Sequence, residues 1–242
     1  MPLVWLRFHA ELEDFLPASF RGRAVKMTFR GPQTVKHLVE AAGVPHVEVG
    51  EVRRGLQQVA WDAVPADGNR LDVFPRLPRA RWPAENDAPR FALDGHLGKL
   101  ASYLRLLGFD TWYRNQVDDA DLAAVAASEG RVVLTRDRDL LKRKAVVYGY
   151  WVRALVPRHQ VAEVLARFAI AGLARPFTRC PRCNGLLHPV PKAEVLDALE
   201  PLTRRYYDEF YRCDRCGQIY WRGSHFERIT ALVDGWLASK EE

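Results

Sequence analysis

The sequence predicts a mixed α/β protein whose centre is a parallel β-sheet flanked by helices. Strand-like and helix-like apolar runs alternate through residues 90–172, which is typical of parallel sheets with helices on their faces. Residues 1–75 have the element order of a separate small α+β domain. Residues 173–242 contain all four cysteines and few long apolar runs, which predicts a small module held together by something other than a large core.

The composition argues against several classes of protein. Of the 242 residues, 48% are hydrophobic and 27% charged, as in ordinary globular proteins and unlike fibrous or disordered ones. No stretch approaches the roughly 20 apolar residues of a membrane-spanning helix, and the N-terminus lacks the apolar region of a secretion signal. We therefore expect a cytoplasmic protein with no membrane partner.

The positive charge is concentrated in one part of the chain. The net charge is +6, but residues 136–182 alone hold 11 Lys and Arg against three Asp and Glu. This block follows the most promising acidic motif directly, so we expect it to form a surface that faces phosphate groups. A solvated basic surface without a partner is the alternative.

Residues 1–75 are predicted to begin with two half-buried strands, because apolar residues alternate over 4–8 and 25–29. Thr34 is a suitable N-cap for a short helix that Gly43 ends. Extended segments follow and finish near residues 71–74. This order resembles a ubiquitin-like β-grasp fold. Residues 76–89 are rich in proline and predict an extended linker, so a new domain is expected to begin near residue 90.

The central domain, residues 90–172, is predicted to alternate strands and helices. Apolar spacing and caps predict strands at 91–93, 109–113, 131–135 and 150–156, and helices at 97–107, from Asp119 onward and at 160–170. Gly108 ends the first helix. Such alternation is the basis for the predicted parallel sheet.

The cysteines form two C-x-x-C pairs, Cys180 with Cys183 and Cys213 with Cys216, separated by 29 residues. Two such pairs can present four thiolates to one tetrahedral Zn²⁺ ion. The alternatives are disulfides, which fit poorly with a cytosolic chain, and a redox pair, which needs no second motif. We expect structural zinc and, within the long separation, a hairpin or helix, with 194–199 as the candidate helix.

Three aspartates follow predicted strands directly. Asp94 ends the first strand of the sheet, and Asp137 and Asp139 follow the strand at 131–135. Because the ends of neighbouring parallel strands meet at one edge, these carboxylates are expected to converge, and Asp119 can join them. Clustered carboxylates suit Mg²⁺ or Mn²⁺, which can activate water for phosphodiester cleavage. Each aspartate also has a simpler explanation as a turn residue, a helix cap or a solvated loop residue.

Several motifs resemble the mutator-seven C-terminal RNase domain family, a PIN-like nuclease family with a zinc ribbon. The motifs are FALDGHLGKL at 91–100, LRLLGFD at 104–110, LTRDRDLL at 134–141, PFTRC at 176–180 and YWRGSH at 220–225. The resemblance covers about residues 90–230. It implies a PIN-like nuclease domain at 90–172 and a zinc-ribbon module at 173–242. Residues 31–36 and 42–46 more weakly resemble the β-grasp domain that often precedes this family.

The resemblance implies metal-dependent cleavage of RNA, including structured RNA such as tRNA, with Mg²⁺ or Mn²⁺ at the acidic set. The matching catalytic positions are Asp94, Lys99, Asp119, Asp137 and Asp139. Lys99 is expected to contact the scissile phosphate or to hold a carboxylate, and an exposed helix lysine is the alternative. Asp118 and Asp121 compete with Asp119 for the second acidic position, which the sequence leaves open.

RNA contacts are expected from basic and aromatic residues near these motifs. The candidates are Arg136, Arg138, Lys142, Arg143, Lys144, Arg179, Trp221 and His225. His225 has packing as its alternative, since four cysteines already complete the zinc site. The aromatic residues between 206 and 211 either stack on unpaired bases or pack the small module.

The β-grasp domain suggests a further function. Ubiquitin-like modifiers and sulfur carriers react through a free C-terminal Gly-Gly, whereas here the chain continues past Phe74 into the linker. We therefore expect this domain to contact protein or RNA. The alternatives to a ribonuclease are a non-catalytic RNA-binding module, associated with tRNA or a ribonucleoprotein, and a protein-interaction adaptor.

Overall fold

A computed structural model describes residues 1–76 and 88–238 of the chain. The chain divides into two compact units. The first comprises Met1–Ala80 with Asp119–Trp151, and the second comprises Arg81–Asp118 with Val152–Glu242. Of the predicted linker at 76–89, residues 77–87 lie outside the described residues.

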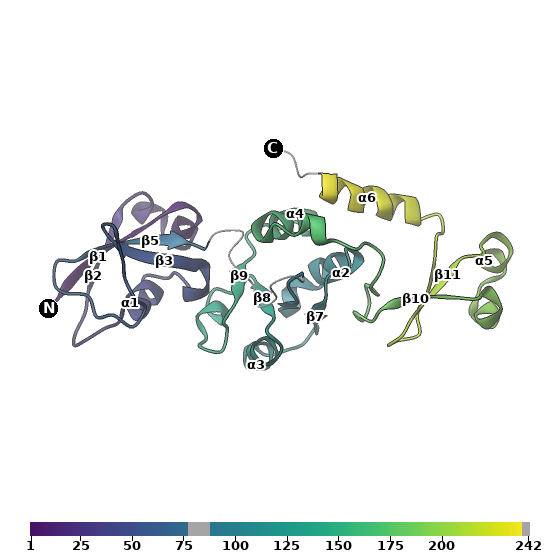
Figure 1. The fold of residues 1–242 in the computed structure, drawn as a ribbon, viewed down its shortest axis with the longest axis horizontal. Coiled ribbons are helices and arrows are strands. Elements are labelled where there is room, and N and C mark those ends of the chain that lie inside the picture. Colours follow the sequence, from purple (N-terminus) through teal and green to yellow (C-terminus); the bar gives the residue numbers. More distant parts are fainter. Residues whose placement is uncertain (77–87, 239–242) are drawn as a thin grey trace. The chain divides into compact units, whose positions relative to one another are not determined.

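The first unit begins with a five-stranded sheet of order β2-β1-β5-β3-β4 (Figure 1). Its strands are β1 (Leu3–Phe8), β2 (Ala24–Thr28), β3 (Val49–Arg54), β4 (Gln57–Gln58) and β5 (Arg70–Pro75). The central pair, β1 and β5, is parallel, while β2 and β3 are antiparallel to their neighbours. This arrangement confirms the predicted ubiquitin-like β-grasp fold.

Helix α1 (Val35–Ala41) begins where the sequence predicts, because Thr34 Oγ1 accepts a hydrogen bond from the backbone N–H of His37 at 3.3 Å. Val35, Leu38 and Val39 of this helix join the core with the inward-facing residues of β1 and β5. Three short 3₁₀ helices complete this part: Ala10–Phe15, Ala18–Phe20 and His46–Glu48.

The first unit also contains α3 (Asp119–Glu129), β8 (Val132–Thr135), a 3₁₀ turn (Leu140–Lys142) and β9 (Gly149–Trp151). Strands β8 and β9 are parallel, and all four residues of β8 are buried. The strand predicted at 150–156 is shorter than expected. The backbone N–H groups of Arg153 and Ala154 donate to the Glu163 carboxylate at 2.8 Å, so the next residues do not continue the strand ladder.

A buried carboxylate joins the β-grasp sheet to this segment. Glu48 is 0% exposed, and its Oε1 accepts a hydrogen bond from the backbone N–H of Trp151 at 2.6 Å. The Trp151 ring packs against the β-grasp core, with its centroid 5.0 Å from that of Phe15. The end of β9 is therefore held by the β-grasp part of the same unit.

The second unit contains the other parallel pair, β6 (Phe91–Leu93) and β7 (Thr111–Tyr113). Helices α2 (Gly98–Leu106) and α4 (Pro157–Phe168) pack against each other beside it (Figure 1). A 3₁₀ turn (Gly95–Leu97) precedes α2, and Gly108 ends it with φ +88°. A Cβ atom at Gly108 would lie 2.2 Å from the Arg175 carbonyl oxygen, so only glycine fits. The two parallel pairs and their helices confirm the α/β class.

The C-terminal module is a three-stranded antiparallel sheet of β10 (Leu187–Val190), β11 (Phe210–Cys213) and β12 (Ile219–Trp221). Between the cysteine pairs the chain forms β10, two 3₁₀ turns (Lys192–Glu194 and Leu196–Ala198) and α5 (Pro201–Tyr206). The helix predicted at 194–199 is therefore wrong. Pro201 disfavours helical geometry at Glu200 and is itself well suited to a first helical position, so the α-helix begins only there.

Helix α6 (Phe226–Ala238) follows the module and packs on the helical part of the second unit. The indole N–H of Trp236 donates to the Arg158 carbonyl oxygen at 3.1 Å, and its ring lies 4.9 Å from that of Tyr103. None of the helices in residues 1–76 and 88–238 has the length and apolar character needed to cross a membrane.

Candidate functional site

The loop after β8 presents two of the predicted catalytic carboxylates. Thr135 Oγ1 accepts from the backbone N–H of Asp137, and Asp137 Oδ1 accepts from the backbone N–H of Asp139, both at 2.8 Å. These bonds turn the chain tightly at the carboxyl end of the strand. The side chain of Asp139 is 85% exposed, so its carboxylate is accessible to a ligand.

Two of the predicted RNA-binding cations are paired with these acids in the first unit. Lys142 Nζ lies 2.9 Å from Asp139 Oδ1, and this bond holds the pKa of Asp139 below its usual value. Arg143 Nη2 lies 3.5 Å from Asp119 Oδ2. Lys144 is exposed, and the carbonyl of Arg136 accepts from the Trp151 indole N–H at 3.3 Å. The basic residues thus lie beside the carboxylates, as the sequence predicts.

Arg138, between the two aspartates, is turned toward the β-grasp part. Its guanidinium donates to the carbonyl oxygens of Asp14 and Phe15 at 3.2 Å each. It also lies 3.9 Å from the ring centroid of Trp151 and 5.3 Å from that of Phe15. These contacts account for Arg138 without RNA, so we read it as an anchor of the acidic loop.

The second unit holds Asp94 and Lys99. Asp94 directly follows β6, is 7% exposed, and accepts a hydrogen bond from the backbone N–H of His96 at 2.8 Å. Lys99 lies on the exposed side of α2, with Nζ 5.1 Å above the Tyr103 ring. Both are therefore where the apolar pattern predicts them.

The sequence leaves the second acidic position open among Asp118, Asp119 and Asp121. Asp119 is the first residue of α3 rather than its cap, and Asp121 lies in the same turn. Asp118 precedes the helix and is exposed. Within the first unit, Asp119, Asp137 and Asp139 do not form a three-residue cluster tight enough to hold a metal ion.

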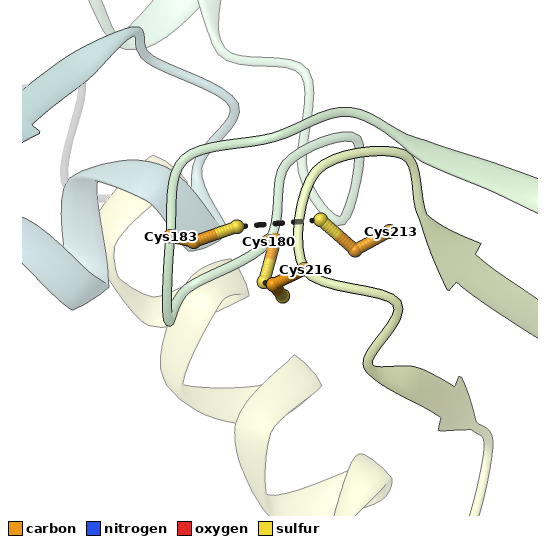
Figure 2. A group of neighbouring side chains, drawn as sticks. All are labelled: Cys180, Cys183, Cys213 and Cys216. Carbon is orange, nitrogen blue, oxygen red and sulfur yellow. Dashed lines mark hydrogen bonds between the residues drawn. The ribbon is translucent and has the colours of Figure 1, made fainter.

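The four cysteines form a cluster that can bind zinc. All four sulfur atoms lie within 4.8 Å of one another, and they turn toward a common point from two loops (Figure 2). The Sγ atoms of Cys180 and Cys216 are 3.8 Å apart, and those of Cys183 and Cys213 are 3.3 Å apart. Zn–S bonds of about 2.3 Å in a tetrahedron place sulfurs about 3.8 Å apart. The cluster therefore has the dimensions of a zinc site.

Tyr220 on β12 borders this cluster. Its hydroxyl lies 3.0 Å from Cys180 Sγ. Burial by itself would raise the pKa of the Cys180 thiol. Hydrogen bonds from the Tyr220 hydroxyl and from backbone N–H groups outweigh this effect and lower the pKa to about 7. Burial raises the pKa of Cys183 to about 12. The thiols therefore differ in ease of deprotonation, which the sequence spacing alone does not indicate.

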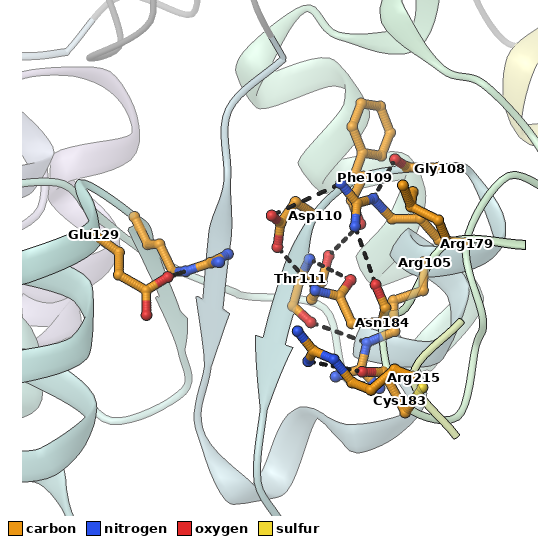
Figure 3. A network of polar contacts seen from close by, with 12 residues as sticks. Arg105, Gly108, Phe109, Asp110, Thr111, Glu129, Arg179, Cys183, Asn184 and Arg215 are labelled. Atoms are coloured by element: carbon orange, nitrogen blue, oxygen red, sulfur yellow. Dashed lines mark hydrogen bonds and ion pairs between the residues drawn. The ribbon is translucent and has the colours of Figure 1, made fainter. Parts of the chain in front are cut away.

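A polar network ties the first cysteine pair to β7 (Figure 3). Arg105 is 4% exposed and donates to the carbonyl oxygens of Thr111, Pro181 and Arg182 at 2.9–3.2 Å. Asn184, which has φ +72°, accepts from the Thr111 backbone N–H at 2.9 Å. Sequence reasoning missed both residues. Only the position of Asn184 directly after Cys183 offered a signal, because asparagine tolerates the left-handed conformation.

Arg179 belongs to the same network. Its guanidinium donates to the carbonyl oxygens of Gly108 at 3.2 Å and Asn184 at 3.0 Å, and lies 3.8 Å from Asp110. The structure therefore gives this predicted RNA-binding residue an internal role.

The remaining predicted RNA-binding residues follow β11. Trp221 ends β12 and is 37% exposed. His225 is exposed, and its Nδ1 accepts a hydrogen bond from Arg228 at 2.9 Å. Neither side chain contributes to the cysteine cluster.

Comparison with known protein families gives a match for both the N-terminal part and the rest of the chain. The family described as Mut7-C RNAse domain matches residues 89–233, and the family described as Mut7-C ubiquitin matches residues 1–81. None of the curated proteins matches the chain. The crystal structure of H. volcanii small archaeal modifier protein 1 is 21% identical, covers 32% of this chain and all of its own, and superposes with a TM-score of 0.25. Because the RNAse-domain match covers more than half of the chain, the protein belongs to the Mut7-C RNAse domain family.

Proposed function

We propose that this protein is a metal-dependent ribonuclease that hydrolyses phosphodiester bonds in structured RNA such as tRNA. The observation that carries the proposal is the position of its acidic residues. Asp94 directly follows one parallel strand, and Asp137 and Asp139 directly follow another, in a chain that belongs to an RNAse-domain family. Ligands of open α/β sheets bind at the carboxyl ends of strands.

The proposed metal ligands are Asp94, Asp119, Asp137 and Asp139. Hard carboxylate oxygens are suitable for Mg²⁺ or Mn²⁺, and Mg²⁺ commonly binds through one or two carboxylates together with substrate phosphates. This preference fits the acidic loop, where Asp137 and Asp139 lie close together and the RNA phosphate would complete the ligand set. Such a metal ion would supply an activated water and stabilise charge on the phosphate.

The cationic side chains have distinct roles in this proposal. Lys99, exposed at the second residue of α2, contacts the scissile phosphate. Lys142, which lowers the pKa of Asp139, and Arg143, which is paired with Asp119, would also contact phosphate groups of the RNA. Arg136 and Lys144 extend the basic surface along the loop. Together they offset the charge of the RNA backbone.

The zinc ion is proposed to be structural. Four thiolates fill a tetrahedral site and leave no position for water or substrate. Four unpaired cysteines gathered in one cluster fit a reducing compartment, so we place the protein in the cytoplasm.

The test is cleavage of small RNA by purified wild-type protein and by the Asp137→Asn variant, with and without added Mg²⁺ or Mn²⁺. Loss of an outer partner of a metal ligand already costs roughly 10–100-fold, so we expect loss of a ligand to reduce the rate more than about 100-fold with RNA binding retained. Asp234→Asn, an exposed aspartate on α6, is the matched control and should cleave normally.

Two results would decide against the proposal. Equal cleavage by Asp137→Asn and wild type would remove the acidic loop from the chemistry. Salt-sensitive RNA binding by wild type without any divalent-dependent cleavage would instead identify a non-catalytic RNA-binding module.

A further inference from the structure

A groove in the second unit gathers aromatic side chains from segments that are distant in the sequence. Its volume is about 940 Å³, near the upper end of the range for small-molecule sites. It is lined by the end of α2, the loop before Cys180, α5, β11, β12 and the start of α6. Seven Phe, Tyr and Trp rings line it: Phe177, Tyr206, Tyr207, Tyr211, Tyr220, Trp221 and Phe226. We call this the aromatic groove.

Two rings of the aromatic groove are much more exposed than the core of the module. Phe210 is 2% exposed and packs with Val190, Val195 and Leu199. In contrast, Tyr206 is 64% exposed and Trp221 is 37% exposed. Tyr207 also packs against this core, whereas Tyr206 and Trp221 are exposed, so core packing does not fully explain those two rings.

The charge of the groove favours an anionic ligand. Arg222 and His225 are the basic residues that line it besides Arg179, whose guanidinium is held by Gly108, Asn184 and Asp110, and no Asp or Glu is among its lining residues. Arg222 is 60% exposed, lies 5.5 Å above the Phe226 ring, and has only a 3.7 Å contact with Glu209. A cation at such a rim is well placed to contact phosphate.

Several polar groups of the groove have no protein partner within the part of the chain that the structure describes. The indole N–H of Trp221 and the hydroxyls of Tyr206, Tyr207 and Tyr211 have no hydrogen-bond partner there. Gly223 packs on the indole, since a Cβ atom there would lie 2.8 Å from Trp221 Nε1. Planar rings with available donors, next to cations, match the faces and edges of nucleobases.

We propose that the aromatic groove binds unpaired nucleotides of the RNA, with bases stacked on Trp221 and Tyr206 and phosphates beside Arg222. The proposal rests on the proposed function for the identity of the ligand, but it adds a site apart from the acidic loop. Its consequence is selectivity: the protein holds a single-stranded segment of its substrate at the zinc-ribbon module.

The experiment measures binding of a labelled ten-nucleotide single-stranded RNA by fluorescence anisotropy, using the full chain without added Mg²⁺ or Mn²⁺. A hairpin with no unpaired end is the comparison ligand. We expect Trp221→Ala to weaken single-strand binding about tenfold, and Trp221→Phe to restore most of it, because stacking needs only a ring. Phe20→Ala, which removes a 43% exposed ring in the β-grasp part, should bind as wild type. Unchanged zinc content and melting temperature of Trp221→Ala show that the variant is folded.

Cross-linking locates the ligand independently. RNA that contains 4-thiouridine is expected to cross-link within residues 206–226. Unchanged affinity of Trp221→Ala, or cross-links confined to other residues, would overturn the proposal even if the protein cleaves RNA. If the groove binds an apolar peptide but no RNA, it is a protein-docking site, and this result would also overturn the proposal. Binding that depends on Trp221 in a protein without nuclease activity would support the groove while refuting the proposed function.

Discussion

Arg138 and Arg105 both donate hydrogen bonds from a guanidinium to backbone carbonyls of a distant segment, but their surroundings differ. Arg138 is half-buried, stacks on Trp151 and Phe15, and ties the acidic loop to the β-grasp part of the first unit. Arg105 is 4% exposed and ties the first cysteine pair to β7 in the second unit.

The two arginines differ in how far their hydrogen-bond partners are open to water. Arg105 is itself buried, and its bond to the Thr111 carbonyl is buried as well, so that carbonyl would be left without a partner if the guanidinium were removed, while the bonds to Pro181 and Arg182 are partly buried. Arg138 contributes stacking on two rings as well as its hydrogen bonds, and its surroundings are partly open to solvent. The Arg105 junction should therefore be more sensitive to substitution, while the Arg138 junction should act more on the position of the acidic loop.

Removal of zinc should have the largest effect. It should destabilise the segment that Arg105 holds in the second unit without affecting the contacts of Arg138 in the first unit. The buried hydrophobic cluster of the C-terminal module is small: among the described residues it comprises Val190, Val195, Leu199 and Phe210, with Tyr207 and Ile219 packed on it. Structural zinc contributes on the order of 10 kcal/mol in small domains. We expect a chelator to remove hydrogen-exchange protection from β10–β12 and to leave β1 and β5 protected. Equal protection before and after chelation would show that the module needs no metal.

Arg105→Met should have the next largest effect. The substitution retains the apolar stem but leaves the carbonyls of Thr111, Pro181 and Arg182 without their donor. Each unsatisfied buried group costs about 1–3 kcal/mol, so we expect the free energy of unfolding to fall by about 3 kcal/mol, with weaker zinc retention. Urea unfolding and metal analysis measure both. Arg182→Met, at an exposed side chain, is the control, and an equal loss there would contradict the assigned role of Arg105.

Arg138→Ala should destabilise the first unit by about 2 kcal/mol, since a partly desolvated cation–π contact contributes up to about that amount. Cleavage should fall more than RNA affinity, because Asp137 and Asp139 flank the substituted residue. Arg138→Lys keeps the charge but not the planar fork, so its effect on both quantities should be intermediate. If affinity and cleavage fall together in Arg138→Ala, then Arg138 contacts RNA directly, as the sequence first suggested.

Thr34→Ala should have the smallest effect and serves as a reference away from both junctions. Loss of the N-cap bond to His37 is expected to cost about 1 kcal/mol. Thr34→Ser retains the hydroxyl and should be close to wild type in thermal unfolding. A change in cleavage or in zinc retention with Thr34→Ala would indicate that the β-grasp part influences both sites more broadly than its contacts suggest.

Much of the fold could be predicted because its signals are local. The alternating apolar residues of β1, the cap at Thr34 and the buried run of β8 depend on neighbours within a few positions. The two C-x-x-C pairs likewise define a metal-sized cluster by their spacing. The helix predicted at 194–199 did not form as one α-helix, because the backbone leaves helical geometry at Val195 and becomes extended at Leu199, which leaves only short 3₁₀ turns in that range.

The aspartates at strand ends and the four thiols could thus be named from the sequence alone, since strand ends and short spacings fix their local placement. The partners of Arg138, Arg105 and Arg179 could not, nor could the gathering of seven rings into the aromatic groove. A guanidinium binds whichever carbonyls the folded chain brings to it, and those of Asp14 lie more than 120 residues from Arg138. Such contacts depend on the packing of distant segments, and only the tertiary structure decides them.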